Sequence, residues 1–136
     1  MFDIQYHLCK TLSYKYELGV QTQKAYKAKD KEKLTQLLSV YKKLIKQRKA
    51  LHKSFKELWY KDNKTFGFEV QDARLGGLVA RVQSCYDDLK DYIDGKLDKI
   101  EGLEEEKLNY ASNQEIVDKK LIYYNSWTGT ISASLV

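Results

Sequence analysis

Residues 34–59 read LTQLLSVYKKLIKQRKALHKSFKELW, and the apolar positions in this stretch recur at helical spacing. A stripe with three to four apolar residues per two turns is typical of a helix packed in a bundle. Asp30 precedes the stretch and is a suitable N-cap, so the sequence predicts a helix over residues 30–61. The stripe consists of three rows that each return every seven residues: Leu34, Tyr41, Arg48 and Phe55; Leu37, Leu44, Leu51 and Leu58; and Leu38, Ile45, His52 and Trp59.

Three further segments have helical patterns of their own. Apolar residues repeat from Leu75 to Ile93, where Asp94-Gly95 supplies a C-terminal cap. Residues 4–29 predict a less regular helix that Gly19 interrupts, and residues 97–108 predict a short acidic one. A helix over 30–61 would be about 48 Å long, which is typical of an elongated helical hairpin. We therefore expect a mainly α fold, an antiparallel bundle of three long helices plus a short one.

The C-terminal end of the chain has a different pattern. Residues 126–136 alternate apolar and polar side chains, which predicts a β-strand. A single strand leaves its backbone unpaired, so it must pair with residues 121–124 or with another sheet. We expect residues 116–136 to form a strand or hairpin tail on a single helical domain, 1–136, that is one part of a larger enzyme.

Composition narrows the class of protein. The chain has 136 residues, 7 glycines and no proline, which favours one domain of long uninterrupted helices. No stretch approaches the roughly 18 apolar residues of a membrane span, and residues 1–7 lack the features of a secretory signal. These features predict a cytoplasmic protein without a membrane partner.

The net charge of +5 is unevenly distributed. Residues 24–56 hold twelve Lys or Arg, whereas residues 87–107 hold nine acids and four bases. Two helices with this contrast can lie against each other and neutralise the excess, so we expect no nucleic-acid partner. The alternative is a stand-alone binding module that uses the basic stretch 42–56 for an anionic partner.

The residues that carry chemistry in enzymes form no recognisable constellation. Cys9 and Cys85 are the only thiols, and we expect both to be reduced and buried. His7 and His52 have no metal-ligand spacing around them, and no glycine-rich phosphate loop occurs. The sequence therefore predicts no catalytic residue, no metal and no cofactor.

Residues 58–78 are the densest unusual stretch, with aromatic, Arg and acidic residues around one interhelical turn. One interpretation is that this stretch forms the end of the bundle, where Phe66 and Phe68 would cap the core and Arg74 would pair with Glu69 or Asp72. The other interpretation is that the stretch forms a docking surface, in which the aromatic and Arg side chains would be interface anchors. Gly76-Gly77 would mark a close helix contact or a helix start. The candidate interface residues are Trp59, Asn63, Phe66, Phe68, Gln71, Asp72, Arg74 and Trp127.

The run 59–78, WYKDNKTFGFEVQDARLGGL, resembles the helical C-terminal region of one bacterial branch of the family 20 glycoside hydrolases, the β-N-acetylhexosaminidases. The resemblance extends from Glu17 to Trp127 and covers nearly the whole chain. One departure is Thr65, where relatives often carry proline.

The resemblance implies a parent enzyme that hydrolyses terminal N-acetylhexosamine residues by a substrate-assisted mechanism, with an adjacent Asp-Glu pair on a barrel. This sequence contains no Asp-Glu dipeptide, and such a barrel needs about 250 residues. The chain is therefore expected to be noncatalytic and to dock on the catalytic barrel of the parent chain, to join two copies as a homodimer, or both.

Overall fold

The computed structural model describes residues 2–105, and they form five helices. Within these residues the prediction of a mainly α fold is confirmed. The predicted strand or hairpin at 116–136 lies outside the described residues. The helices are α1 (Phe2–Lys15), α2 (Leu18–Lys27), α3 (Lys31–Asp62), α4 (Phe68–Ile93) and α5 (Glu101–Glu104).

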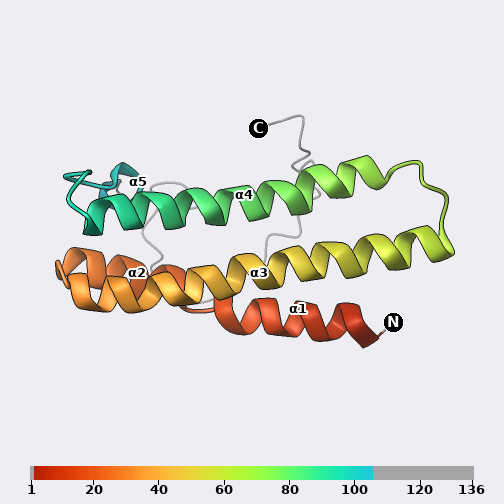
Figure 1. Cartoon of the computed structure of the whole chain (residues 1–136), viewed down its shortest axis with the longest axis horizontal. Helices are drawn as coiled ribbons and strands as arrows, with labels where there is room; N and C mark the ends of the chain where they lie inside the picture. The colour runs from red at the N-terminus through yellow and green to blue at the C-terminus, as the bar shows by residue number, and fades with distance from the viewer. Residues whose placement is uncertain (1, 106–136) are drawn as a thin grey trace, which may run out of the picture.

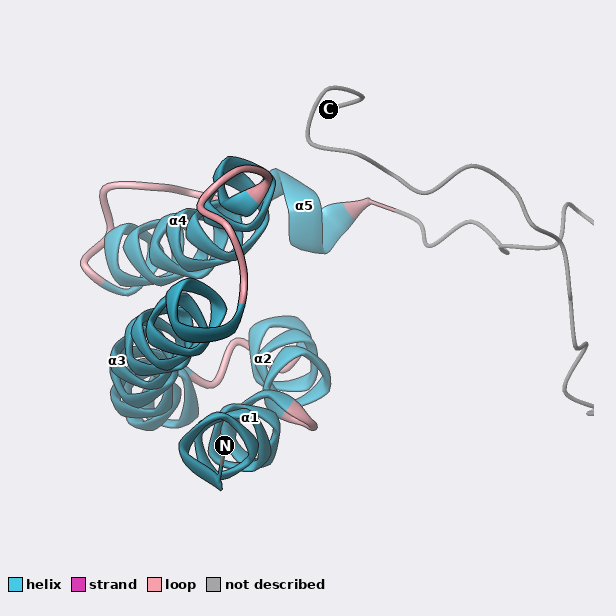
Figure 2. Ribbon diagram, turned by 90° about the vertical axis from the view of Figure 1, so that its right-hand side faces the viewer, coloured by secondary structure: helices cyan, strands magenta, loops and turns pink. Residues whose placement is uncertain are grey.

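The long helix α3 is the centre of the structure (Figure 1). It begins at Lys31 because the Asp30 carboxylate accepts a hydrogen bond from the backbone N–H of Lys33 at 2.9 Å. It ends at Asp62, so the predicted range 30–61 is confirmed to within one residue at each end. α4 returns antiparallel beside it, and α1 and α2 pack along another side of α3 (Figures 1 and 2).

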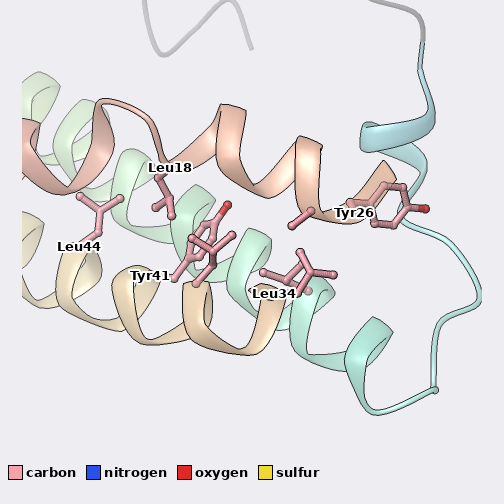
Figure 3. Close-up of a cluster of buried hydrophobic side chains, with 8 residues drawn as sticks. Leu18, Tyr26, Leu34, Tyr41 and Leu44 are labelled. Atoms are coloured by element: carbon pink, nitrogen blue, oxygen red, sulfur yellow. The ribbon is translucent and has the colours of Figure 1, made fainter. Parts of the chain in front are cut away.

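The buried core lies at one end of α3. Between Leu34 and Ile45 the apolar stripe of α3 is buried except for the half-buried Leu38, whereas from Leu51 to Trp59 it is only half-buried. The reason is that α2 closes over the first half, as the close-up in Figure 3 shows. The buried cluster consists of Leu18, Ala25 and Tyr26 from α2, Leu34, Leu37, Tyr41 and Leu44 from α3, and Leu89 from α4.

The N-terminal part differs from the prediction. A single helix interrupted at Gly19 is wrong, because the break lies at Tyr16 and Glu17, and Gly19 lies in the first turn of α2. The change of direction turns Leu18 into the core, where it is 6% exposed. The bundle therefore has two long helices, α3 and α4, and the predicted first helix is divided into α1 and α2.

The predicted short acidic helix over 97–108 is much shorter in the described residues, where α5 spans Glu101–Glu104. Tyr26 explains its position. The Tyr26 hydroxyl donates to Oε1 of Glu104 at 2.6 Å and accepts from the backbone N–H of Ile100 at 3.1 Å. These two bonds tie the residue before α5 and the last residue of α5 to α2.

Both interpretations of Gly76-Gly77 are wrong. α4 begins at Phe68, so these glycines lie inside the helix and not at its start. In the described part of the chain, no neighbouring element comes within 4 Å of a Cβ built on either one. They form an open stretch of α4 and not a close helix contact.

Candidate docking surface

The α3–α4 turn is held by a backbone geometry that requires glycine. Gly67 has φ +90° and lies directly before α4. A side chain is disfavoured at this φ because Cβ approaches the backbone. The backbone N–H of Phe68 donates to the Thr65 carbonyl at 3.2 Å, and the Trp59 indole N–H donates to the Lys64 carbonyl at 2.9 Å. The turn is thus fixed at both of its ends.

Phe68 is the centre of an aromatic cluster just inside this turn. It is 1% exposed, and four rings from α3 surround it. Their centroids lie between 5.2 and 6.2 Å from that of Phe68. Stacked, tilted and edge contacts between rings stabilise the fold beyond the burial of their surface area. The four surrounding side chains are His52, Phe55, Trp59 and Tyr60.

The polar groups near this cluster pair differently from the prediction. Asp72 accepts a hydrogen bond from His52 at 2.7 Å across the α3–α4 interface. The predicted pairing of Arg74 with Glu69 or Asp72 is absent among the described ion pairs, and Arg74 is exposed. The reason is geometric, since Asp72 lies on the side of α4 that meets α3.

Two phenylalanines that the sequence treats alike have opposite environments. Phe66 is 87% exposed at the apex of the turn, whereas Phe68 is buried. The prediction that both cap the core is therefore wrong for Phe66. We call the segment 59–70 the hairpin tip, and Phe66 is its most exposed aromatic side chain.

The other candidate interface residues do not form one surface. Asn63 is exposed at the end of α3, and Trp59 is half-buried against Phe68. Gln71 lines a groove with Leu75, away from Phe66 at the turn. Trp127 lies outside the described residues. The contact between His52 and Asp72 was missed, because residues 20 positions apart give no periodic signal.

The basic stretch 42–56 lies along α3 with its lysines exposed. Two of them lie over aromatic rings, Lys42 over Tyr86 at 5.6 Å and Lys56 over Tyr60 at 5.5 Å. The expected side-by-side placement of basic α3 and acidic α4 is confirmed, but within residues 2–105 no Lys or Arg of α3 forms an ion pair with α4, and the polar contact between their side chains there is His52–Asp72. The lysines of the basic stretch are therefore not neutralised by ion pairs with described residues of α4.

The remaining polar residues have structural surroundings. Cys9 is exposed, so the prediction that both thiols are buried is wrong, while Cys85 is half-buried against the core. Burial raises the pKa of Tyr41, whose hydroxyl lies 3.1 Å from that of Thr22.

Within residues 2–105 no group of three metal-ligating side chains gathers, and no helix there is long and apolar enough to span a membrane.

Comparison with known proteins assigns the family. The family described as Glycoside Hydrolase 20C C-terminal domain matches residues 1–122. Searches of curated proteins and of solved structures give no significant match. The family match confirms the resemblance carried by residues 59–78, and it covers all five helices. The chain therefore belongs to the C-terminal domain family of the 20C glycoside hydrolases.

Proposed function

We propose that this chain is the noncatalytic C-terminal domain of a bacterial β-N-acetylhexosaminidase whose catalytic barrel lies elsewhere in the parent protein. Membership of the 20C C-terminal domain family supports the proposal. The sequence lacks the Asp-Glu dipeptide that the substrate-assisted mechanism needs, which points the same way. Detectable turnover of an N-acetylglucosaminide by the purified chain would contradict the noncatalytic part.

The role of the domain in this proposal is docking, and the exposure of Phe66 carries it. Phe66 is 87% exposed on a turn that Gly67 and the cluster around Phe68 hold in place. A preorganised aromatic side chain loses little conformational entropy on binding, and aromatic residues are enriched among interface hot spots. The partner is the catalytic barrel of the parent chain, a second copy of the domain, or both.

The test is Phe66→Ala in the full-length parent enzyme. We expect a change in oligomeric state, measured by light scattering, or a rise in KM and loss of thermal stability if the tip contacts the barrel. Tyr16→Ala is the matched control, because Tyr16 is also 87% exposed but lies at the α1–α2 break. If both variants keep the assembly state, the KM and the melting temperature of the parent, the tip is not the docking surface.

A second candidate function rests on the row of lysines along α3. Lys42, Lys46, Lys49, Lys53 and Lys56 follow one face at alternating spacings of four and three, and all are exposed. One of them forms an ion pair within the described residues, Lys53 with Glu57 at 3.9 Å. This row of exposed positive charges suits the binding of an anionic polymer.

Heparin binding by the purified chain tests this second candidate. Affinity that falls steeply with added salt, through counterion release, would support it. Replacing Lys46 and Lys49 by Glu should then abolish binding, while Lys24→Glu with Lys27→Glu on α2 should leave most of it. Absent or salt-insensitive binding would remove the candidate.

A further inference from the structure

A cavity lies beside α5, where residues of α2, α3 and α4 come together. Its volume is about 380 Å³, within the range of roughly 300–1,000 Å³ that small-molecule sites usually have. Thr22 of α2 and Tyr41 of α3 belong to its lining, and one face of α4 and residues from the segment 97–103 complete it. The cavity is at the α5 end of the bundle, away from the hairpin tip (Figure 1).

Two buried hydroxyl groups lie at the inner end of this cavity. The Thr22 hydroxyl donates to the Leu18 carbonyl at 2.7 Å and lies 3.1 Å from the Tyr41 hydroxyl. Because Thr22 has a single hydroxyl proton, Tyr41 is the donor in the second of these bonds. The Tyr41 oxygen keeps its own lone pairs, and no described group of residues 2–105 donates to it. The inner end of the cavity therefore presents a hydrogen-bond acceptor.

Two charges that described residues do not neutralise lie at the mouth, where the lining residues are exposed. Arg81 and Asp88 are seven residues apart on α4, with Cys85 between them on the same face. Within residues 2–105 neither of them forms an ion pair. Lys99 and Glu101, also at the mouth, pair with each other at 3.5 Å. The mouth thus offers a cation and an anion about 10 Å apart along α4.

The part of the cavity between the charges and the hydroxyl groups is apolar. Leu89 is buried in the core cluster, and the half-buried Ile100 and Leu103 pack against that cluster. Small-molecule sites usually combine such apolar walls with a few convergent polar groups that fix the orientation of the ligand. The polar groups here are an acceptor inside and two opposite charges outside.

We propose that this cavity binds a small zwitterion whose apolar body ends in a hydroxyl group, which is the chemistry of the free amino acid tyrosine. The ligand hydroxyl donates to the Tyr41 oxygen, and the apolar body lies between Leu89 and Ile100. The ligand carboxylate pairs with Arg81, and its ammonium group pairs with Asp88. A guanidinium matches a carboxylate through two parallel hydrogen bonds. The site is separate from both the docking surface and the lysine row proposed above.

Binding of four related probes to the full 136-residue chain tests the proposal. L-Tyrosine carries all three polar groups, whereas L-phenylalanine lacks the hydroxyl, tyramine lacks the carboxylate and hydroxyphenylpropionate lacks the ammonium group. We expect each analogue to bind at least about fivefold more weakly than L-tyrosine, because each loses one hydrogen-bonded group of the ligand. Titrations followed by NMR measure the four dissociation constants.

The thiol of Cys85 gives a second readout inside the cavity. Cys85 lines the cavity between Arg81 and Asp88, and it is the single thiol of the chain in a Cys9→Ser background. L-Tyrosine well above its dissociation constant should slow the labelling of Cys85 by a small maleimide at least about fivefold, since only the unoccupied cavity leaves the thiol accessible. L-Tyrosine that binds without slowing this reaction is bound elsewhere, which would overturn the proposal.

Three variants assign the three contacts. Arg81→Gln should abolish the preference for L-tyrosine over tyramine, and Asp88→Asn the preference over hydroxyphenylpropionate. Tyr41→Phe should abolish the preference over L-phenylalanine. Each variant removes the one preference that belongs to its own contact, which a general loss of structure would not do. Arg74→Gln and Asp87→Asn are the matched controls, because both residues are exposed on α4 and do not line the cavity.

Three further results would also overturn the proposal. Absent binding of L-tyrosine at millimolar concentration means that the cavity does not take this ligand. Equal binding of all four probes means that apolar contact alone holds them. Tighter binding of tyramine or of hydroxyphenylpropionate than of L-tyrosine means that the site selects a single charge. None of these results bears on the docking role of Phe66, which is tested separately.

Discussion

Nε2 of His52 lies 2.7 Å from Oδ1 of Asp72, and this contact joins α3 to α4 beside the turn that connects them. The His52 ring also stacks on Phe68 with an interplanar angle of 10°. One side chain of α3 therefore contacts both a polar and an aromatic residue of α4. This arrangement fixes the rotation of α4 about its own axis at the end of the hairpin where Phe66 is exposed.

The contact between His52 and Asp72 should show a measurable but small coupling. The Asp72 side chain is 49% exposed, so solvent screens the interaction. In a double-mutant cycle of His52→Ala and Asp72→Ala, followed by urea unfolding, we expect a coupling free energy of about 0.5–1 kcal/mol. Additive effects of the two substitutions would show that the pair contributes nothing in solution.

Phe68→Ala and Phe66→Ala should separate stability from docking. Phe68 fills the space between four rings, and its removal should lower the free energy of unfolding by about 3–5 kcal/mol. Phe66 is exposed, so its removal should change the same quantity by less than about 0.5 kcal/mol. Thermal and urea unfolding of the isolated chain measure both. Equal losses for the two variants would contradict the described packing.

Two glycines should respond in opposite directions to alanine. Gly67 has φ +90°, where a Cβ costs about 1–2 kcal/mol, so Gly67→Ala should destabilise. Gly77 lies inside α4 with no neighbouring element of the described chain within 4 Å of an added Cβ. Gly77→Ala should therefore stabilise by up to about 1 kcal/mol through helix propensity. The melting temperatures of the two variants, compared with that of the unsubstituted 136-residue chain, give the sign of each effect directly.

Tyr41 should make stability depend on pH at the alkaline end. Burial raises the pKa of Tyr41 above its ordinary value of 10.0, so the unfolded chain releases this proton at a lower pH than the folded one. The contribution is complete below pH 10 and is lost as the pH rises through the folded pKa.

Tyr41→Phe is the variant that checks this pH dependence. It should flatten the decline of stability at alkaline pH, and Thr22 keeps its 2.7 Å hydrogen bond to the Leu18 carbonyl in the variant. Denaturant unfolding at a series of alkaline pH values measures the effect. An unchanged slope in Tyr41→Phe would mean that other groups cause the decline.

Features set by neighbours in sequence were predicted well. The helix over 30–61 follows from a repeat, and its Asp30 cap follows from an acceptor side chain three residues before the N–H that donates to it; both are confirmed. The position of the break between α1 and α2 was not predicted, because Gly19 is compatible with a helix. The burial of Leu18 decides where the chain turns. Local propensity is a weak signal when tertiary burial opposes it.

The sequence by itself determined that the chain is helical, where α3 begins and ends, and which family it belongs to, since these depend on periodicity and on residue identity along a continuous run. Only the tertiary structure decided that Phe68 is buried and Phe66 exposed, and that His52 meets Asp72. Phe66 and Phe68 differ in burial because Phe66 lies in the turn, whereas Phe68 is the first residue of α4, and the rotation of α4 against α3 directs its ring into the interface. That rotation is set by contacts between α3 and α4 that are distant in the chain.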